Sequence, residues 1–211
     1  VDFSKVTTVG ERAFRECITL KNVDLSNVTT TGDYAFFRCW GFTGELNMPK
    51  LTAPGKYLFR ECKNITKVSA PVLENMSLYM FAECTALADI DMPVLKKVEN
   101  FSFNKCEGLT KVDMPTVETV VQTEACAMKN ILSLMAVHRG KLTFVNNSSL
   151  RTVHLPKVQT IGERTFSDLW TLEEAGSAFF YCGGPTSISL PKLKTAGESC
   201  FAYSKIGRAH V

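Results

Sequence analysis

The sequence has no long apolar run and no dense cluster of one charge sign. No apolar stretch approaches the roughly 18 residues that a membrane span needs, so we expect no direct membrane insertion by this segment. The 24 basic and 21 acidic residues are spread along the 211-residue chain without a run of like charges. A nucleic-acid surface would show clustered lysine and arginine. We therefore expect a partner other than nucleic acid.

Catalytic and metal-binding motifs are also missing. Imidazole is available only at His138, His154 and His210, and no Cys or Ser stands beside a His in a recognisable nucleophile motif. The phosphate-binding loops GxGxxG and GxxxxGKS are absent. No CxxC pair occurs, which argues against structural zinc. The sequence predicts a protein that is not an enzyme and holds no cofactor or metal.

What the sequence has instead is one repeated unit. In FNKCEGLTKVDMP, which begins at Phe103, a Cys follows the Phe by three residues, aliphatic residues follow at six and nine, and Pro follows at twelve. The segments that begin at Phe59 and Phe81 match it throughout. The Phe position recurs at Phe14, Phe36, Phe59, Phe81, Phe103, Phe144, Phe166, Phe179 and Phe201, with Ala125 replacing it once. The steps are mostly 22 residues, a period typical of stacked leucine-rich repeats.

The residues before each Pro indicate a strand. Val112 and Met114 alternate with Lys111 and Asp113, so one pair would face inward and the other solvent. Pro then ends the strand because it cannot donate to the ladder. A second apolar pair and a Gly follow, which predicts a short second strand and a turn with positive φ at the Gly. The segment around the Phe would then be one or two turns of helix or a tight loop, and we predict the short helical segment.

These elements define the predicted fold class. We predict an α/β solenoid, a leucine-rich repeat right-handed coil with a parallel β-sheet on one face and short strands, turns and helical segments on the other. Residues 1–205 would form one domain of about ten layers, because a solenoid grows by adding layers rather than by enlarging one core.

Some segments depart from the repeat. Residues 115–150 lack the Phe–Cys pair, and only 13 residues separate Phe166 from Phe179, so we expect irregular layers at 115–150 and 166–179. Residues 206–211, IGRAHV, resemble nothing earlier in the chain. Their codons can spell a common sequencing adapter, so we expect a non-native tail; a native terminal cap is the alternative.

Cysteine also follows the period. Neighbouring layers lie about 4.8 Å apart, which is within reach of a disulfide, but parallel side chains are poorly aimed for one. Cys also behaves as a small buried hydrophobe. We predict a buried, reduced ladder, with disulfides as the alternative. Five cysteines join the phenylalanines in the predicted repeat core: Cys17, Cys39, Cys62, Cys84 and Cys106.

The joint Phe, Cys, Leu and Pro spacing resembles the BspA-like class of leucine-rich repeats. It is visible in VGERAFRECITLKNVDL and in IGERTFSDLWTL, and the resemblance covers about residues 3–204. The resemblance implies a curved solenoid that is secreted or held at a cell surface, with binding and adhesion roles.

Two functions remain open. The first is a binding or adhesion module for a protein or glycan, and the second is a passive stalk or spacer for a domain outside this segment. Variation in the outward strand residues from repeat to repeat favours binding. Those columns lack aromatic anchors, so we expect weak binding per layer. The charged outward residues form the candidate binding face: Lys67, Asp89, Asp91, Lys111 and Asp113.

Overall fold

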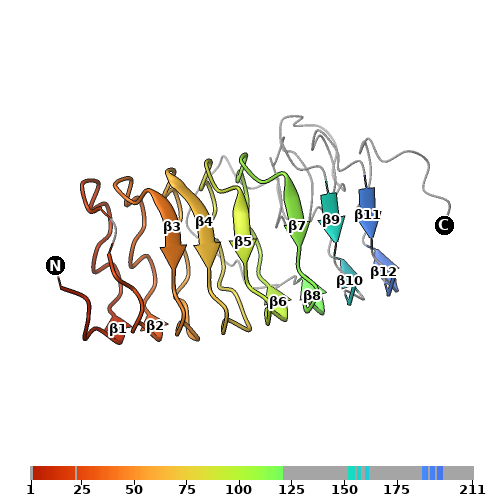
Figure 1. The fold of residues 1–211 in the computed structure, drawn as a ribbon, viewed down its shortest axis with the longest axis horizontal. Helices are drawn as coiled ribbons and strands as arrows, with labels where there is room; N and C mark the ends of the chain where they lie inside the picture. The colour runs from red at the N-terminus through yellow and green to blue at the C-terminus, as the bar shows by residue number, and fades with distance from the viewer. Residues whose placement is uncertain are drawn as a thin grey trace, which may run out of the picture.

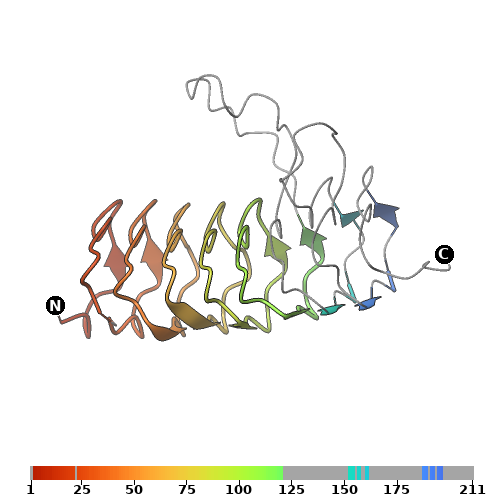
Figure 2. The same cartoon turned by 90° about the horizontal axis from the view of Figure 1, so that it is seen from above.

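Successive repeats lie side by side along the long axis of the molecule (Figures 1 and 2). Among the described residues, the first two repeats have only a two-residue strand and the next two have only a longer strand. The remaining four repeats run from a three-residue strand through a turn to a two-residue strand. The computed structural model describes residues 2–21, 23–120, 152–154, 156–157, 160–161, 187–189, 191–192 and 194–196. The predicted continuity of one domain over residues 1–205 extends beyond these residues and stays a prediction.

The longer strands form one row. They are β3 (Gly44–Asn47), β4 (Ile65–Ser69), β5 (Asp89–Asp91), β7 (Lys111–Asp113), β9 (Thr152–His154) and β11 (Ser187–Ser189). They pair in parallel as β3-β4-β5 and β7-β9-β11. Equivalent residues lie opposite one another, as Leu46, Val68 and Ile90 do across three strands. The predicted parallel pairing is therefore confirmed for these small sheets.

The two-residue strands form a second row below the longer strands in the view of Figure 1. They are β1 (Thr8–Val9), β2 (Thr30–Thr31), β6 (Lys97–Val98), β8 (Thr119–Val120), β10 (Thr160–Ile161) and β12 (Thr195–Ala196). β1 pairs with β2, and β6, β8, β10 and β12 form a parallel sheet. The outward side of the longer row is called the strand face below, and the segment around each repeat Phe is called the turn side.

A column of stacked phenylalanines lies in the core. Phe36, Phe59, Phe81 and Phe103 are each 0% exposed. Their ring centroids are 5.4, 5.7 and 6.0 Å apart from one repeat to the next, with interplanar angles of 3°, 6° and 12°. Phe14 is partly buried and stacks on Phe36. Four further predicted members lie outside the described residues: Phe144, Phe166, Phe179 and Phe201.

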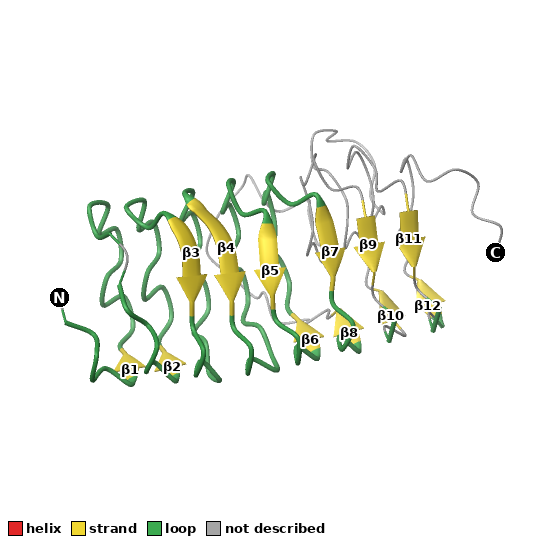
Figure 3. Cartoon of the chain, in the orientation of Figure 1, coloured by secondary structure: helices red, strands yellow, loops and turns green. Residues whose placement is uncertain are grey.

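The structure corrects the prediction of short helical segments, because the described residues contain no helix (Figure 3). The turn side consists of overlapping turns. The N–H of Phe59 donates to the Met80 carbonyl of the next repeat at 2.9 Å, whereas the N–H of Arg60 donates to Tyr57 within its own repeat at 3.3 Å. Alternate N–H groups therefore point along the stacking axis, which prevents the i to i−4 bonding of an α-helix.

Left-handed backbone makes this alternation possible. The residues two before and two after each Phe have positive φ, for example Tyr57 at 58° and Glu61 at 62°. The same holds for Arg12, Glu16, Tyr34, Arg38, Tyr79, Glu83, Phe101 and Lys105. This conformation costs a non-glycine residue about 1–2 kcal/mol. Each inter-repeat hydrogen bond offsets about 0.5–1.5 kcal/mol of that cost.

The expected positive φ at the repeat glycines is wrong for Gly32 and Gly55. A Cβ at Gly32 would lie 2.4 Å from the Glu11 nitrogen, and one at Gly55 would lie 2.1 Å from the Gly32 carbonyl. Glycine is needed there because the backbones of neighbouring repeats approach too closely for a side chain.

The cysteines form a ladder of thiol donors. The Sγ of Cys62 lies 3.1 Å from the Phe36 carbonyl oxygen of the preceding repeat, and Cys84 makes the same bond to Phe59 at 3.2 Å. Cys39 and Cys106 repeat it with Phe14 and Phe81. All four are buried free thiols, and Cys17 is a half-buried one. Burial raises the pKa of Cys39 to about 12 and the pKa of Cys62 and Cys84 well above the ordinary thiol value.

Replacing Phe81 by Ala tests the aromatic column. Phe81 stacks between Phe59 and Phe103, so its loss should lower the free energy of unfolding by about 3–5 kcal/mol. Urea denaturation followed by circular dichroism measures the change. Val94→Ala, at a side chain 38% exposed, is the control and should have a much smaller effect. An unchanged unfolding midpoint for Phe81→Ala would contradict the stacked core.

Thiol labelling tests the cysteine ladder. At pH 8, iodoacetamide should modify half-buried Cys17 at least tenfold faster than Cys62 or Cys84, because reaction needs an accessible thiolate. Peptide mass spectrometry reports each cysteine separately, and labelling in 6 M guanidinium is the control in which the rates converge. Fast labelling of Cys84 in the folded chain would rule out a buried ladder.

Glycine substitution tests the left-handed positions. Lys105 is exposed and has a φ of 56°, so Lys105→Gly should raise the free energy of unfolding by about 0.5–1 kcal/mol, because glycine adopts positive φ without steric cost. Glu107→Gly, at an exposed position without positive φ, should lower it. If denaturant titrations showed that both substitutions destabilise the chain equally, Lys105 would carry no backbone strain at its positive φ.

Candidate binding face

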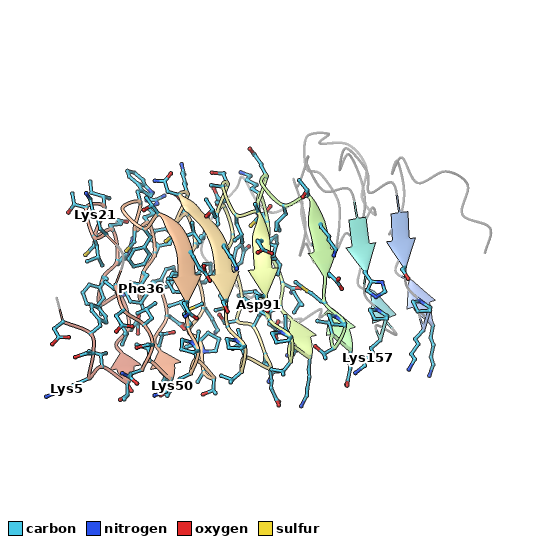
Figure 4. All side chains as sticks on the ribbon, viewed as in Figure 1. Lys5, Lys21, Phe36, Lys50, Asp91 and Lys157 are labelled. Carbon is cyan, nitrogen blue, oxygen red and sulfur yellow. The ribbon has the colours of Figure 1, made fainter. Side chains whose placement is uncertain are left out.

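Charged side chains project from the strand face because residues alternate in and out along each strand. In β7, Lys111 and Asp113 are exposed and Val112 is buried. Parallel pairing then brings equivalent residues together. Lys67 lies opposite Asp89, and Ser69 lies opposite Asp91. Figure 4 shows Asp91 on this face, on β5.

The charges of this face are linked by weak, solvent-exposed contacts. The Nζ of Lys67 lies 3.8 Å from both Glu45 Oε1 and Asp89 Oδ2, so one lysine connects three strands. Lys111 Nζ lies 3.1 Å from Asp113 Oδ2. Exposed ion pairs of this kind contribute only about 0–1 kcal/mol. A partner can therefore replace these contacts at little cost.

The five predicted residues do not lie on one continuous sheet. Lys67, Asp89 and Asp91 belong to β4 and β5, whereas Lys111 and Asp113 belong to β7 of a separate sheet. Figure 1 shows β5 and β7 further apart than β4 and β5. The structure therefore places the candidate residues on both sides of an interruption. We call the facing edges of β5 and β7 the seam.

The seam is held closed at both ends. Beyond one end, the N–H of Gly108 donates to the Thr85 carbonyl at 2.9 Å. At the other end, the Thr116 hydroxyl donates to the Pro93 carbonyl, also at 2.9 Å. Between these bonds, no strand pairing joins β5 to β7 within described residues 85–116. Ile90 is consequently only half-buried.

A second aromatic stack, on the turn side, was missed from the sequence. Tyr34, Tyr57, Tyr79 and Phe101 stack with centroids 4.5, 4.8 and 4.3 Å apart. The available signal was an aromatic residue recurring two positions before the repeat Phe.

Arginine and glutamate alternate beside this aromatic stack. Arg38 Nε donates to Glu61 at 2.8 Å, and Arg60 Nη2 donates to Glu83 at 2.7 Å. The hydrogen bond to Glu61 raises the pKa of Arg38. These rings and charges are already engaged with neighbouring repeats. The turn side therefore joins repeats, and the strand face remains the better candidate for recognition.

One repeat carries an extra residue on the strand side. Phe42 and Leu46 are four positions apart where Ile65 and Val68 are three apart, which accounts for one step of 23 residues. Pairing of β3 with β4 shifts register at Gly44, whose φ is 76°. The shift leaves a small hollow lined by Val23, Phe42, Thr43, Gly44, Glu45, Leu46, Asn47 and Ile65. It is too small to hold an organic ligand.

The described residues offer no metal site, since they contain no group of three His, Cys, Asp or Glu side chains positioned around a common point. They also contain no helix with the length and apolar character of a membrane span.

Comparisons with known proteins find the same kind of repeat. The family described as BspA type leucine rich repeat region (6 copies) matches residues 2–94, 44–142, 74–176 and 140–211. The chain is similar to a leucine-rich repeat protein from Bacteroides ovatus ATCC 8483, solved at 1.19 Å, with 22% identity and a TM-score of 0.48. The alignment covers 93% of this chain and 55% of that protein, so the chain spans about half its length. No curated protein matches. The overlapping family matches show that the chain belongs to the BspA-type leucine-rich repeat family.

Proposed function

We propose that this chain is a non-enzymatic binding module that recognises a protein or glycan through its strand face. Leucine-rich repeats generally mediate protein binding, and the BspA-type family is associated with surface or secreted bacterial proteins. The observation that carries the proposal is the array of charges on β4, β5 and β7: half-buried Lys67 and the exposed Asp89, Asp91, Lys111 and Asp113.

The form of this face favours an extended partner. Small-molecule sites are concave pockets that bury most of the ligand, and this face instead presents charges on successive strands. Within a paired sheet such strands recur about every 4.8 Å. A protein segment or glycan chain lying across them could contact several repeats at once.

The proposed setting is a cell-surface or secreted protein that adheres to a host, with the repeats forming one continuous solenoid. Nucleic acid is not the proposed partner, because lysines of the strand face alternate with carboxylates. Lys67 lies between Glu45 and Asp89, and Lys111 lies beside Asp113.

A passive stalk or spacer is the second candidate. Its support is the turn side, where stacked rings and alternating ion pairs join one repeat to the next. Such connections would stiffen a spacer whether or not the strand face binds anything.

Neutralising the strand face tests the proposal. A variant with Lys67, Asp89, Asp91, Lys111 and Asp113 all changed to Ala should lose at least tenfold in affinity for any ligand found by screening host matrix proteins and glycans. Biolayer interferometry measures the affinity. The matched control removes two lysines and three carboxylates elsewhere, all of them exposed: Lys56, Glu74, Lys96, Glu107 and Glu118.

The control separates recognition from general charge effects. It should retain binding within about twofold, because its substitutions are away from the candidate residues. Equal binding by both variants would exclude the strand face as the site. A chain that binds no ligand in the screen would favour the spacer.

A further inference from the structure

We infer that the seam between β5 and β7 accepts an extended segment of a protein partner, and that this segment carries an apolar residue next to a lysine or arginine. The inference rests on the proposed function and makes it more specific. It assigns a peptide backbone, rather than a glycan, to the centre of the strand face.

Within the described part of the chain, the backbone at the seam lacks a hydrogen bond that follows β3, β4 and β7. Met48, Ala70 and Met114 each donate an N–H to the following strand, at 2.9, 2.9 and 3.1 Å. Met92 occupies the equivalent place after β5, and no such bond from it appears among the described residues. Among the residues that the structure describes, the facing edges of β5 and β7 thus present strand backbone without a strand partner. An extended peptide binds such edges through its main chain.

The ends of the seam limit the length of the segment. The bonds from Gly108 to Thr85 and from Thr116 to Pro93 hold the two repeats together on either side. Only the three residues of β5 and the three of β7 lie at its centre. An extended chain rises about 3.3 Å per residue. The seam therefore suits about three to five residues of extended chain.

The preference for an apolar residue in the peptide follows from the partial exposure of Ile90. Ile90 is only half-buried, whereas Val68 and Val112 in the neighbouring repeats are 0% and 1% exposed. A peptide lying in the seam would place one inward side chain over Ile90. An apolar side chain there would complete the burial of Ile90, as neighbouring strands do in the paired sheets.

The preference for a lysine or arginine in the peptide follows from two carboxylates at equivalent positions of neighbouring repeats. Asp91 and Asp113 occupy the same outward site in repeats 22 residues apart. An outward side chain of the peptide at that level would lie between them, and lysine or arginine is the complementary choice. At the other outward level the equivalent residues are Asp89 and Lys111, whose opposite charges leave no preference of sign. Because side chains alternate, the basic residue is the immediate neighbour of the apolar one in either chain direction.

A labelled peptide tests the inference directly. Fluorescein-labelled STVKVTS is titrated with the whole chain at 50 mM salt, and anisotropy reports binding. Two control peptides accompany it: STVDVTS reverses the charge, and an STVKVTS analogue methylated on every backbone nitrogen from the first threonine to the last serine keeps the charge but cannot donate hydrogen bonds from those residues. Of the three peptides, we expect only STVKVTS to bind. In hydrogen exchange, the backbone amides of Asp89–Met92 should then exchange more slowly in the complex than in the free chain.

Matched protein variants locate the contact. Asp91→Asn with Asp113→Asn should weaken STVKVTS binding at least tenfold. Glu11→Gln with Glu74→Gln removes two exposed carboxylates elsewhere and should change the affinity less than twofold. Equal weakening by both variants would show a general charge effect and overturn the inference.

The remaining outcomes are also decisive. Equal binding of the N-methylated peptide would show ionic attraction without strand addition, and would overturn the inference. So would absence of STVKVTS binding at 1 mM. The proposed function would survive that failure if the five-residue variant still lost its screened ligand. The converse result is that STVKVTS binds while the five-residue variant still binds the screened ligand normally. That result would exclude the strand face as the site of the screened ligand and would leave the inference about the seam standing.

Discussion

The structure depends on the direction of backbone hydrogen bonds between repeats. At the turn side, alternate N–H groups leave the repeat and bond to the next one, as Phe59 does to Met80. This requires left-handed backbone at two positions per repeat, which non-glycine side chains occupy at a cost. Stacking offsets that cost, because the same alignment places aromatic rings directly over one another. Each repeat is thus stable only against its neighbours, as expected of a repeat array.

The close alignment also explains why particular residue types recur. Gly32 and Gly55 lie where neighbouring backbones leave no room for a Cβ. Cys62 and Cys84 fill small core positions and donate to a carbonyl oxygen of the preceding repeat. Serine could make the bond but would bury a more polar group, and alanine would leave the carbonyl without this donor. The recurrence of Cys therefore reflects packing and one weak hydrogen bond, with no requirement for disulfide or metal chemistry.

The sequence predicted the parts of the fold that depend on side-chain alternation. Period two places Val112 and Met114 inward, where the structure buries them, and the predicted parallel pairing is present in the small sheets. The helical segment was predicted wrongly because Glu61 and its equivalents look like helix formers, while their φ is set by bonds to another repeat. Tyr57 and Tyr79 carried a visible period, yet their stacking depends on that same unexpected backbone. Local propensity could not reveal a conformation imposed between repeats.

Repeats of similar sequence differ in whether their strands pair, and the seam is the example. The segments that begin at Phe81 and Phe103 share every defining residue, but their strands do not pair. Their outward residues offer a physical reason. Lys67 faces Asp89 across a paired junction, with 3.8 Å between the charged atoms, whereas closing β5 on β7 would bring Asp91 against Asp113. Like charges directly opposite each other destabilise a strand pair. Closure would also bring Asp89 against Lys111, so Asp91 and Asp113 form the repulsive level of the junction and Asp89 and Lys111 the attractive one. A basic side chain between Asp91 and Asp113 would relieve that repulsion, which is why the charge of these two carboxylates favours a basic segment at this junction.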